Sequence, residues 1–316
     1  MKMNSSICLT FILFLMIKKI TSNDKPIIGI LTQEIYWSSF RDHLLPYKTY
    51  IAASYVKAIE SSGGRVVPVF TNRTSKYYME VASKVNGILV PGGGCSFNMT
   101  FGIGGSTNTI FKIAEHMNNI HDHFPVLGVC LGFELLLMAS INGKYPFVNC
   151  HAYNISLPLE LIPNMEEKSV LFQNMPKDIR KILLTEPVTV NSHGKCITPK
   201  NFTSMHLNQF WNSITINNVN NLTFISTIEA QRYPFVGLQF HPEKNAFEWE
   251  RNYPHSLSAI HTVRYFYDWF VDECRKNKHA YTNITALKNE LIYNYPSTYV
   301  GKFKSTTFEQ VYFFNE

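Results

Sequence analysis

The stretch Pro125–Leu137, PVLGVCLGFELLL, places a cysteine between two glycines. An apolar run precedes Cys130, and a run with helical character follows it. This order predicts a buried strand that turns sharply into a helix, with Gly128 and Gly132 allowing a close approach. The thiol would then stand at the carboxyl end of a sheet and the amino end of a helix, a position that suits a thiolate nucleophile. A buried structural cysteine is the alternative.

Apolar runs of strand length alternate with helical patterns on both sides of this turn. The expected strands are 27–31, 65–70, 86–91 and 126–129, and the expected helices are 47–61, 75–84, 108–119 and 131–140. Because these strands are apolar throughout, they predict an α/β fold with a parallel sheet buried on both faces. Pro68 indicates that the second strand lies at an edge or reaches an end.

The second half of the chain has shorter strand-like pieces. They cover 153–161, 188–190, 213–216, 222–228 and 235–240, with turns expected at 191–194 and 217–221. An amphipathic helix over 256–276 closes the fold. The aromatic segment 298–314 is rich in β-formers, and it could pack on the core or contribute to a dimer. Since no repeat or linker is visible, a single domain over 23–316 is expected.

A histidine follows the last of these strands in the segment Val236–Lys244, VGLQFHPEK. His241 at a strand end, with Glu243 two residues later, suits a general base that a carboxylate orients. A histidine that only satisfies local hydrogen bonds is the alternative.

A glycine-rich loop, Pro91–Gly94, follows another strand. The backbone N–H groups of Gly93 and Gly94, together with that of Leu131, could bind the oxyanion that forms when a thiol attacks a carbonyl. A phosphate-binding loop is the alternative, but no Walker Lys-Ser/Thr pair follows.

Together, PGGG, GVCLGFE and QFHPEK resemble the motifs of the class I glutamine amidotransferase-like fold. Within it, the chain is most similar to the secreted and lysosomal folate γ-glutamyl hydrolases. Further matching segments are KPIIGIL at 25–31, YIAASYVKAIES at 50–61, RVVPV at 65–69, NGILVPGG at 86–93 and FISTIE at 224–229. This resemblance implies a flavodoxin-like three-layer α/β/α sandwich with a mostly parallel central sheet.

The resemblance also implies roles for individual residues. Cys130 matches the nucleophile, His241 the base and Glu243 the third member of a triad. Glu134 stands where amidotransferases usually carry glutamine, which fits a γ-linked peptide substrate, and His193 in NSHGK matches a substrate-cleft histidine. A plain loop histidine is the alternative for His193. The implied reaction cleaves folyl poly-γ-glutamates through a thioester, with no metal or redox cofactor.

Two other functions remain open at this stage. A glutamine amidotransferase-type glutaminase is disfavoured because no synthase domain follows the motifs. A non-catalytic binding protein on the same fold is disfavoured because all three triad residues are present. Nucleic acid is not an expected partner: three of the 29 basic residues lie in the first 22 positions, and the remaining 26 oppose 23 acidic residues without a dense basic cluster.

The N-terminal residues 1–22 resemble a secretory signal, with Lys2 before the apolar run 7–17. An uncleaved anchor or a buried helix is the alternative. We expect a secreted, lysosomal or vacuolar protein that does not span a membrane once the signal is removed. The resemblance implies a homodimer.

Six glycosylation sequons agree with secretion; they start at Asn72, Asn98, Asn154, Asn201, Asn221 and Asn283. Five cysteines remain after residue 22, so at least one thiol is free or pairs between chains. Their pairing stays open, and the absence of a C-x-x-C spacing disfavours a structural zinc site.

Overall fold

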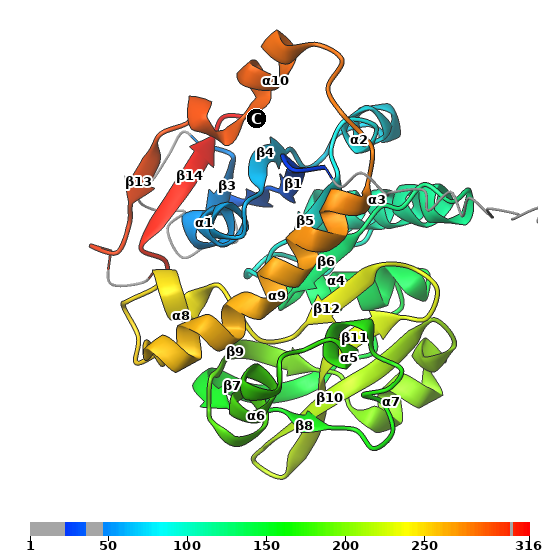
Figure 1. Ribbon diagram of the computed structural model, residues 1–316, viewed down its shortest axis with the longest axis vertical. Coiled ribbons are helices and arrows are strands. Elements are labelled where there is room, and N and C mark those ends of the chain that lie inside the picture. Colours follow the sequence, from blue (N-terminus) through cyan, green and yellow to red (C-terminus); the bar gives the residue numbers. More distant parts are fainter. Residues whose placement is uncertain (1–22, 36–46, 304–305) are drawn as a thin grey trace, which may run out of the picture.

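The computed structural model describes residues 23–35, 47–303 and 306–316. The predicted signal over 1–22 therefore lies outside the described residues. At the centre is an eight-stranded sheet with the order β4-β1-β5-β6-β12-β11-β10-β8 (Figure 1). None of the helices in the described ranges is long and apolar enough to cross a bilayer.

The first five strands in this order are parallel, and the last three are antiparallel. The parallel strands are β4 (Arg65–Val69), β1 (Ile27–Leu31), β5 (Gly87–Val90), β6 (Val126–Val129) and β12 (Phe235–Leu238). The antiparallel strands are β11 (Leu222–Ala230), β10 (Trp211–Val219) and β8 (Glu160–Leu161). The edge position expected from Pro68 is confirmed, because β4 ends the sheet.

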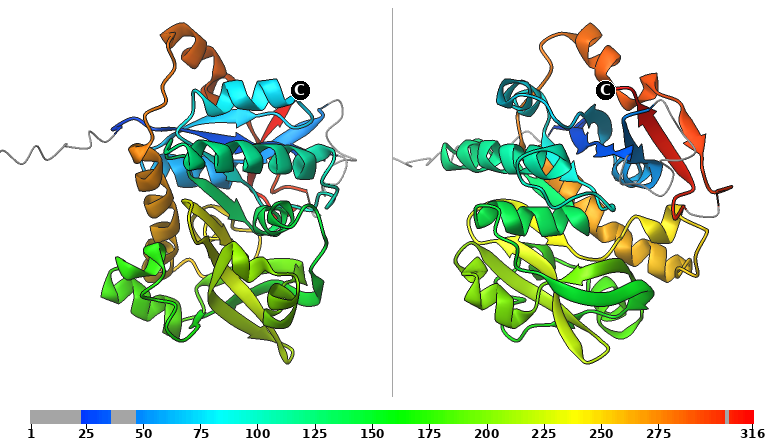
Figure 2. Two further views of the ribbon diagram at one scale, coloured as in Figure 1. Left: turned by 90° about the vertical axis from the view of Figure 1, so that its right-hand side faces the viewer. Right: turned by 180° about the vertical axis from the view of Figure 1, so that it is seen from behind.

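Helices cover both faces of the parallel part (Figures 1 and 2). One face carries α1 (Ala53–Ser61) and α9 (Leu257–Lys276), and the other carries α2 (Ser75–Ala82), α3 (Gly102–Asn119) and α4 (Leu131–Ser140). Alternate residues of β1 serve the two cores: Ile28 and Ile30 pack with the first, Ile27 and Leu31 with the second. The expected three-layer α/β/α sandwich is confirmed.

Two smaller sheets flank the central one. The first has the order β13 (Ser297–Tyr299), β14 (Gln310–Phe314), β3 (Thr49–Ala52) and β2 (Gln33–Glu34). Since β14 pairs with β3, the aromatic C-terminal segment packs on the core. The second is a ribbon of β7 (Val148–Leu157) and β9 (Thr189–Cys196). The short helices are α5 (Val170–Gln173), α6 (Lys177–Thr185), α7 (Pro199–Ser204), α8 (Lys244–Phe247) and α10 (Ile284–Glu290), with 3₁₀ turns at Leu207–Gln209 and Ile292–Asn294.

Three local expectations were wrong. Residues 49–52 form β3 rather than the start of a helix, because their backbone pairs with β14 and β2. Residues 191–194 lie inside β9 rather than in a turn, because irregular register against β7 accommodates them. Helix α3 begins at Gly102, six residues before the expected start at Asn108, because close packing against the preceding loop requires its glycines despite their poor helix propensity.

Candidate active site

Cys130 occupies the sharp turn between β6 and α4. Its backbone has a φ of 51° and a ψ of −107°, a positive-φ conformation that a non-glycine residue rarely adopts. A Cβ atom at Gly132 would lie 2.0 Å from the Val90 carbonyl oxygen, and one at Gly128 would lie 2.6 Å from the Gly132 carbonyl oxygen. Only glycine fits at both positions, so the close approach predicted from the sequence is confirmed.

The carboxyl ends of β5, β6 and β12 meet at a cavity of about 1000 Å³. Because these three strands are neighbours, the glycine loop, Cys130 and His241 all come to the same edge of the sheet. Strands β7 and β9 form a second wall, and the C-terminal segment a third. The lining residues are Tyr50, Gly93, Gly94, Cys95, Phe97, Cys130, Leu131, Glu134, Asn149, His151, Tyr153, Ser192, His193, Gly194, Lys195, His241, Lys244, Thr307 and Phe308.

His241 and Cys130 both lie close to Gly92. A Cβ atom at this glycine would be 2.7 Å from His241 Cε1 and 2.9 Å from Cys130 Cβ. Beyond the ring, His241 Nδ1 lies 2.7 Å from Glu243 Oε1. When Nδ1–H donates to this carboxylate, Nε2 is left as the basic atom. Tyr267 donates its hydroxyl to the other Glu243 oxygen at 3.3 Å, so the carboxylate is held at both ends.

The electrostatics favour a neutral resting pair. Burial raises the pKa of the Cys130 thiol, and Glu134 and Glu243 raise it further when they are ionised. Burial also lowers the pKa of His241, despite its attraction to Glu243. The N–H of Leu131 acts in the opposite direction on the thiol, but burial outweighs it. The resting thiolate expected from the helix amino end is therefore not favoured, and the proton must leave during attack.

The residues proposed as oxyanion donors line the same cavity as Cys130. Gly93, Gly94 and Leu131 all line the cavity beside Cys130. The N–H of Gly92 is unavailable, because it donates to the Tyr55 hydroxyl at 2.9 Å. In this loop, Gly93 and Gly94 are therefore the candidates for donating an N–H to the oxyanion.

Glu134 projects from the first turn of α4 and lines the cavity although only 3% exposed. Gln239 Nε2 donates to its Oε1 at 3.3 Å. Burial raises the pKa of Glu134 to about 8. At neutral pH this side chain is a carboxylic acid, which can donate as well as accept a hydrogen bond.

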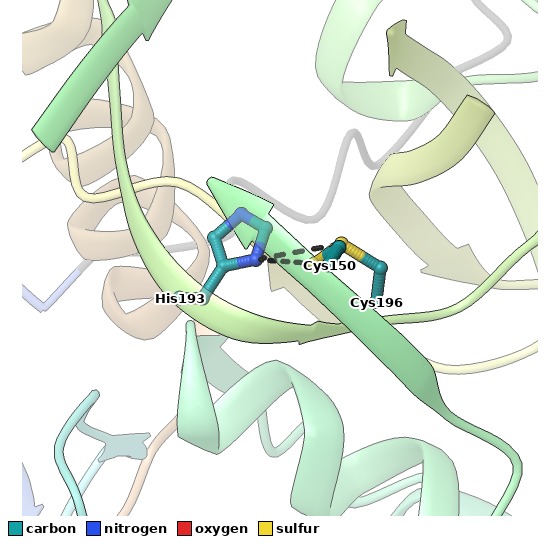
Figure 3. A group of neighbouring side chains, drawn as sticks. All are labelled: Cys150, His193 and Cys196. Atoms are coloured by element: carbon teal, nitrogen blue, oxygen red, sulfur yellow. Dashed lines mark hydrogen bonds between the residues drawn. A yellow bond between two sulfur atoms is a disulfide. The ribbon is translucent and has the colours of Figure 1, made fainter. Parts of the chain in front are cut away.

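His193 lies on β9 beside Cys150 and Cys196 (Figure 3), and it is buried. Burial lowers its pKa to about 3. Its Nδ1 atom lies 3.5 Å and 3.6 Å from the sulfurs of Cys150 and Cys196. His193 lies on a strand and lines the cavity rather than standing in a loop, and its contact with a substrate stays a prediction.

Cys150 and Cys196 form a disulfide that joins β7 to β9, which settles the pairing left open by the sequence. With His193 they make a group whose ligand atoms lie within 4.8 Å of one another. Since both sulfurs are bonded to each other, they offer no thiolate to a metal. Cys95, Cys130 and Cys274 are free and buried.

Three residues of this region were not recognised as functional from the sequence. Tyr55 lay in an apolar helical pattern, but its hydroxyl stands 3.3 Å from His241 Nδ1. Tyr267 lay in the core stripe of α9, and it donates to Glu243. Lys244 ends the HPEK motif, and the structure buries it in the cavity wall. Only Lys244 had a usable signal, a cation directly after the triad acid.

The six sequons differ in accessibility. Asn72, Asn154, Asn221 and Asn283 are exposed, whereas Asn98 and Asn201 are partly buried. Asn201 Nδ2, the atom that would carry a glycan, donates to the Pro146 carbonyl at 2.8 Å.

Comparisons with known proteins agree on one group. Residues 48–256 match the model of the family described as glutamine amidotransferase class-I. γ-Glutamyl hydrolase B of Dictyostelium discoideum is 36% identical, covering 93% of this chain and 84% of that protein. The γ-glutamyl hydrolase of Homo sapiens is 36% identical over a match that covers 92% of this chain and 90% of that protein. γ-Glutamyl hydrolase 1 of Arabidopsis thaliana is 35% identical over a match that covers 93% of this chain and 84% of that protein.

Proposed function

Because the chain belongs to the γ-glutamyl hydrolase family, on a class I glutamine amidotransferase domain, we propose that it hydrolyses γ-glutamyl bonds with Cys130 as the nucleophile. The observation that carries this proposal is the arrangement of Cys130, His241 and Glu243 at one edge of the sheet. A thiol, a base and an orienting acid in this order are what covalent acyl transfer requires.

The reaction starts from the neutral pair. Cys130 Sγ attacks the γ-carbonyl carbon while its proton passes to His241 Nε2. The carbonyl oxygen takes the displaced electron pair, and the N–H groups of Leu131 and of Gly93 or Gly94 stabilise it. The tetrahedral intermediate collapses, the C–N bond breaks, and His241 gives its proton to the leaving amine. A water molecule then loses a proton to His241, attacks the thioester and releases the acid and the Cys130 thiol.

We further propose that the substrate is a folyl or antifolyl poly-γ-glutamate. The charge of the cavity supports this choice: Lys195 and Lys244 line it, and Glu134 is uncharged at neutral pH. Each unit of a poly-γ-glutamate chain carries an α-carboxylate, so this cavity suits it electrostatically. The cavity volume of about 1000 Å³ accommodates several units of such a chain.

Glu134 and His193 are proposed to contact this chain. The protonated Glu134 can donate to a substrate carbonyl or carboxylate, which an ionised carboxylate could not do. His193 reaches the cavity from the opposite wall, on the ribbon held by the disulfide. Glu134 on α4 and His193 on β9 would thus contact the substrate from two different elements.

The protein is further proposed to be a secreted, lysosomal or vacuolar glycoprotein that forms a homodimer. A disulfide and four exposed sequons support an oxidising compartment. Mass analysis of the protein exported by a eukaryotic host tests this: an N-terminus near residue 23 and glycans on exposed sequons are expected, and retention of residues 1–22 would contradict it. Light scattering tests the dimer.

The central experiment compares the mature protein with its Cys130→Ala variant on folate pentaglutamate. Products are followed by mass, so that their lengths distinguish cleavage inside the chain from removal of the last unit. We expect shortened folates from the wild type alone and a loss of at least about 10³-fold in the variant. Turnover by a correctly folded Cys130→Ala variant would exclude this nucleophile. Hydrolysis of free glutamine, with folates untouched, would instead favour a glutaminase.

A further inference from the structure

Lys244 is a buried cation in the wall of the catalytic cavity. It opens α8 directly after the triad acid Glu243, and its residue is only 2% exposed. It lines the same cavity as Cys130 and His241. An ammonium group withdrawn from water costs free energy unless an anion compensates it. A buried lysine at this position therefore indicates that an anion binds to it.

The two acids near Lys244 form hydrogen bonds with other groups. Glu243 uses one oxygen for His241 and the other for Tyr267. Glu248, also buried, accepts the Glu309 backbone N–H through Oε2 at 2.6 Å, whereas its Oε1 has no hydrogen-bond partner among the described residues. Within the described residues, neither carboxylate comes close enough to Lys244 Nζ to form an ion pair. Their charges act on it only from a distance.

Two aromatic rings position the ammonium group. Nζ lies 4.8 Å from the centre of the Phe308 ring and 5.6 Å from that of Tyr253. Phe308 belongs to the C-terminal segment and itself lines the cavity. Ring faces attract a cation but carry no net charge, so they orient Lys244 without neutralising it. The Lys244 ammonium is thus preorganised to bind an anion.

We propose that Lys244 binds the α-carboxylate of the glutamyl unit whose γ-carbonyl Cys130 attacks. This assignment rests on the proposed γ-glutamyl hydrolase function. In a glutamyl unit only the Cα, Cβ and Cγ atoms separate the α-carboxyl carbon from the γ-carbonyl carbon. A carboxylate that accompanies the attacked carbonyl must therefore sit close to Cys130. Lys244 meets this condition, since it follows the triad by one residue and shares the cavity with the nucleophile.

The binding would make Lys244 a specificity-determining residue. A γ-linked glutamate presents a free α-carboxylate beside the scissile bond, whereas an ordinary α-linked peptide has an amide there. A charged hydrogen bond to the lysine would favour the former, and a buried ammonium left unpaired would penalise the latter.

The test pairs a change in the enzyme with a matched change in the substrate. One substrate is 4-aminobenzoyl-γ-glutamyl-glutamate, and the other has a carboxamide in place of the α-carboxylate of its first glutamyl unit. The enzymes are the wild type, Lys244→Met, Lys244→Arg and the control Lys57→Met. Lys57 Nζ also lies over a ring, 5.9 Å from the centre of Phe247, but outside the cavity.

On the carboxylate substrate, Lys244→Met should lower kcat/KM by roughly 10- to 100-fold. The wild type should lose a similar factor on the carboxamide, and Lys244→Met should lose little more on it. Lys244→Arg should retain part of the preference, because it keeps the cation. Lys57→Met should match the wild type on both substrates.

Equal losses of Lys244→Met on both substrates would overturn the proposal, because the lysine would then act on the fold or on the protons of Cys130 and His241. If Lys244→Met does not fold, the wild type still decides: equal kcat/KM for carboxylate and carboxamide contradicts the assignment. A wild type that cleaves neither these nor folate pentaglutamate would refute the proposed function itself.

Discussion

A single methyl group at Gly92 should disable the active site while leaving the fold intact. In Gly92→Ala the new Cβ would meet His241 Cε1 at 2.7 Å, Tyr55 Oη at 2.8 Å and Cys130 Cβ at 2.9 Å. Ordinary van der Waals contacts begin at 3.4 Å, so these groups must move apart by about 0.5–0.7 Å. The Gly92 N–H also anchors Tyr55, which limits how the site can relax.

The expected magnitude follows from that displacement. A misplacement of about 1 Å between reacting groups can cost about 10²-fold in rate, so we expect kcat/KM to fall by roughly 100-fold. Overpacking of this kind costs about 1–3 kcal/mol of unfolding free energy, which a domain of this size tolerates. The assay is initial-rate hydrolysis of folate pentaglutamate, with urea unfolding measured in parallel.

Gly64→Ala is the matched control. Its Cβ would meet Ile28 Cδ1 at 2.7 Å and Ile59 Cγ2 at 2.8 Å, a similar crowding far from the cavity. It should lose stability comparably but keep kcat/KM near the wild-type value. A Gly92→Ala variant as active as the wild type would refute the geometry of Cys130 and His241 described above.

Two further predictions concern the walls of the cavity. Because Glu134 has a pKa of about 8 in the folded protein against 4.5 in the unfolded chain, the native state holds the extra proton, and the unfolding free energy should fall as pH rises between these values. Urea unfolding should show a smaller fall for Glu134→Gln, and parallel curves would contradict the raised pKa. The disulfide closes a loop between residues 46 positions apart, so Cys150→Ser with Cys196→Ser should lose about 4 kcal/mol in the chain-entropy treatment. This double variant should also raise KM, because β9 carries His193 and because the Val190 carbonyl on β9 accepts the backbone N–H of His241. An unchanged KM would show that the β7–β9 ribbon keeps its place without the disulfide.

Local sequence patterns predicted most of the elements in the parallel half. Strand β1 was expected over its observed residues, and β6 and α4 around Cys130 were expected with their bounds. These elements have strong local signals: wholly apolar runs, glycine punctuation and helical spacing. Where the signal depended on distant partners, it misled. Residues 49–52 read as a helix because their strand character comes from pairing with the C-terminal β14.

The sequence by itself determined the chemical groups: a thiol between glycines at a strand–helix junction, a histidine followed by an acid, and a glycine loop after a third strand. Each signal is local, because a turn, a strand end and a backbone approach depend on a few adjacent residues. Tertiary structure alone decided how these groups act together. The neighbouring order of β5, β6 and β12 brings the motifs to one cavity, and burial there keeps Cys130 and His241 neutral. The Tyr55 hydroxyl accepts from Gly92, Tyr267 donates to Glu243, and a disulfide joins Cys150 to Cys196. These partners lie far apart in the chain, and only packing brings them within reach. Packing also buries the cation of Lys244 in the cavity wall.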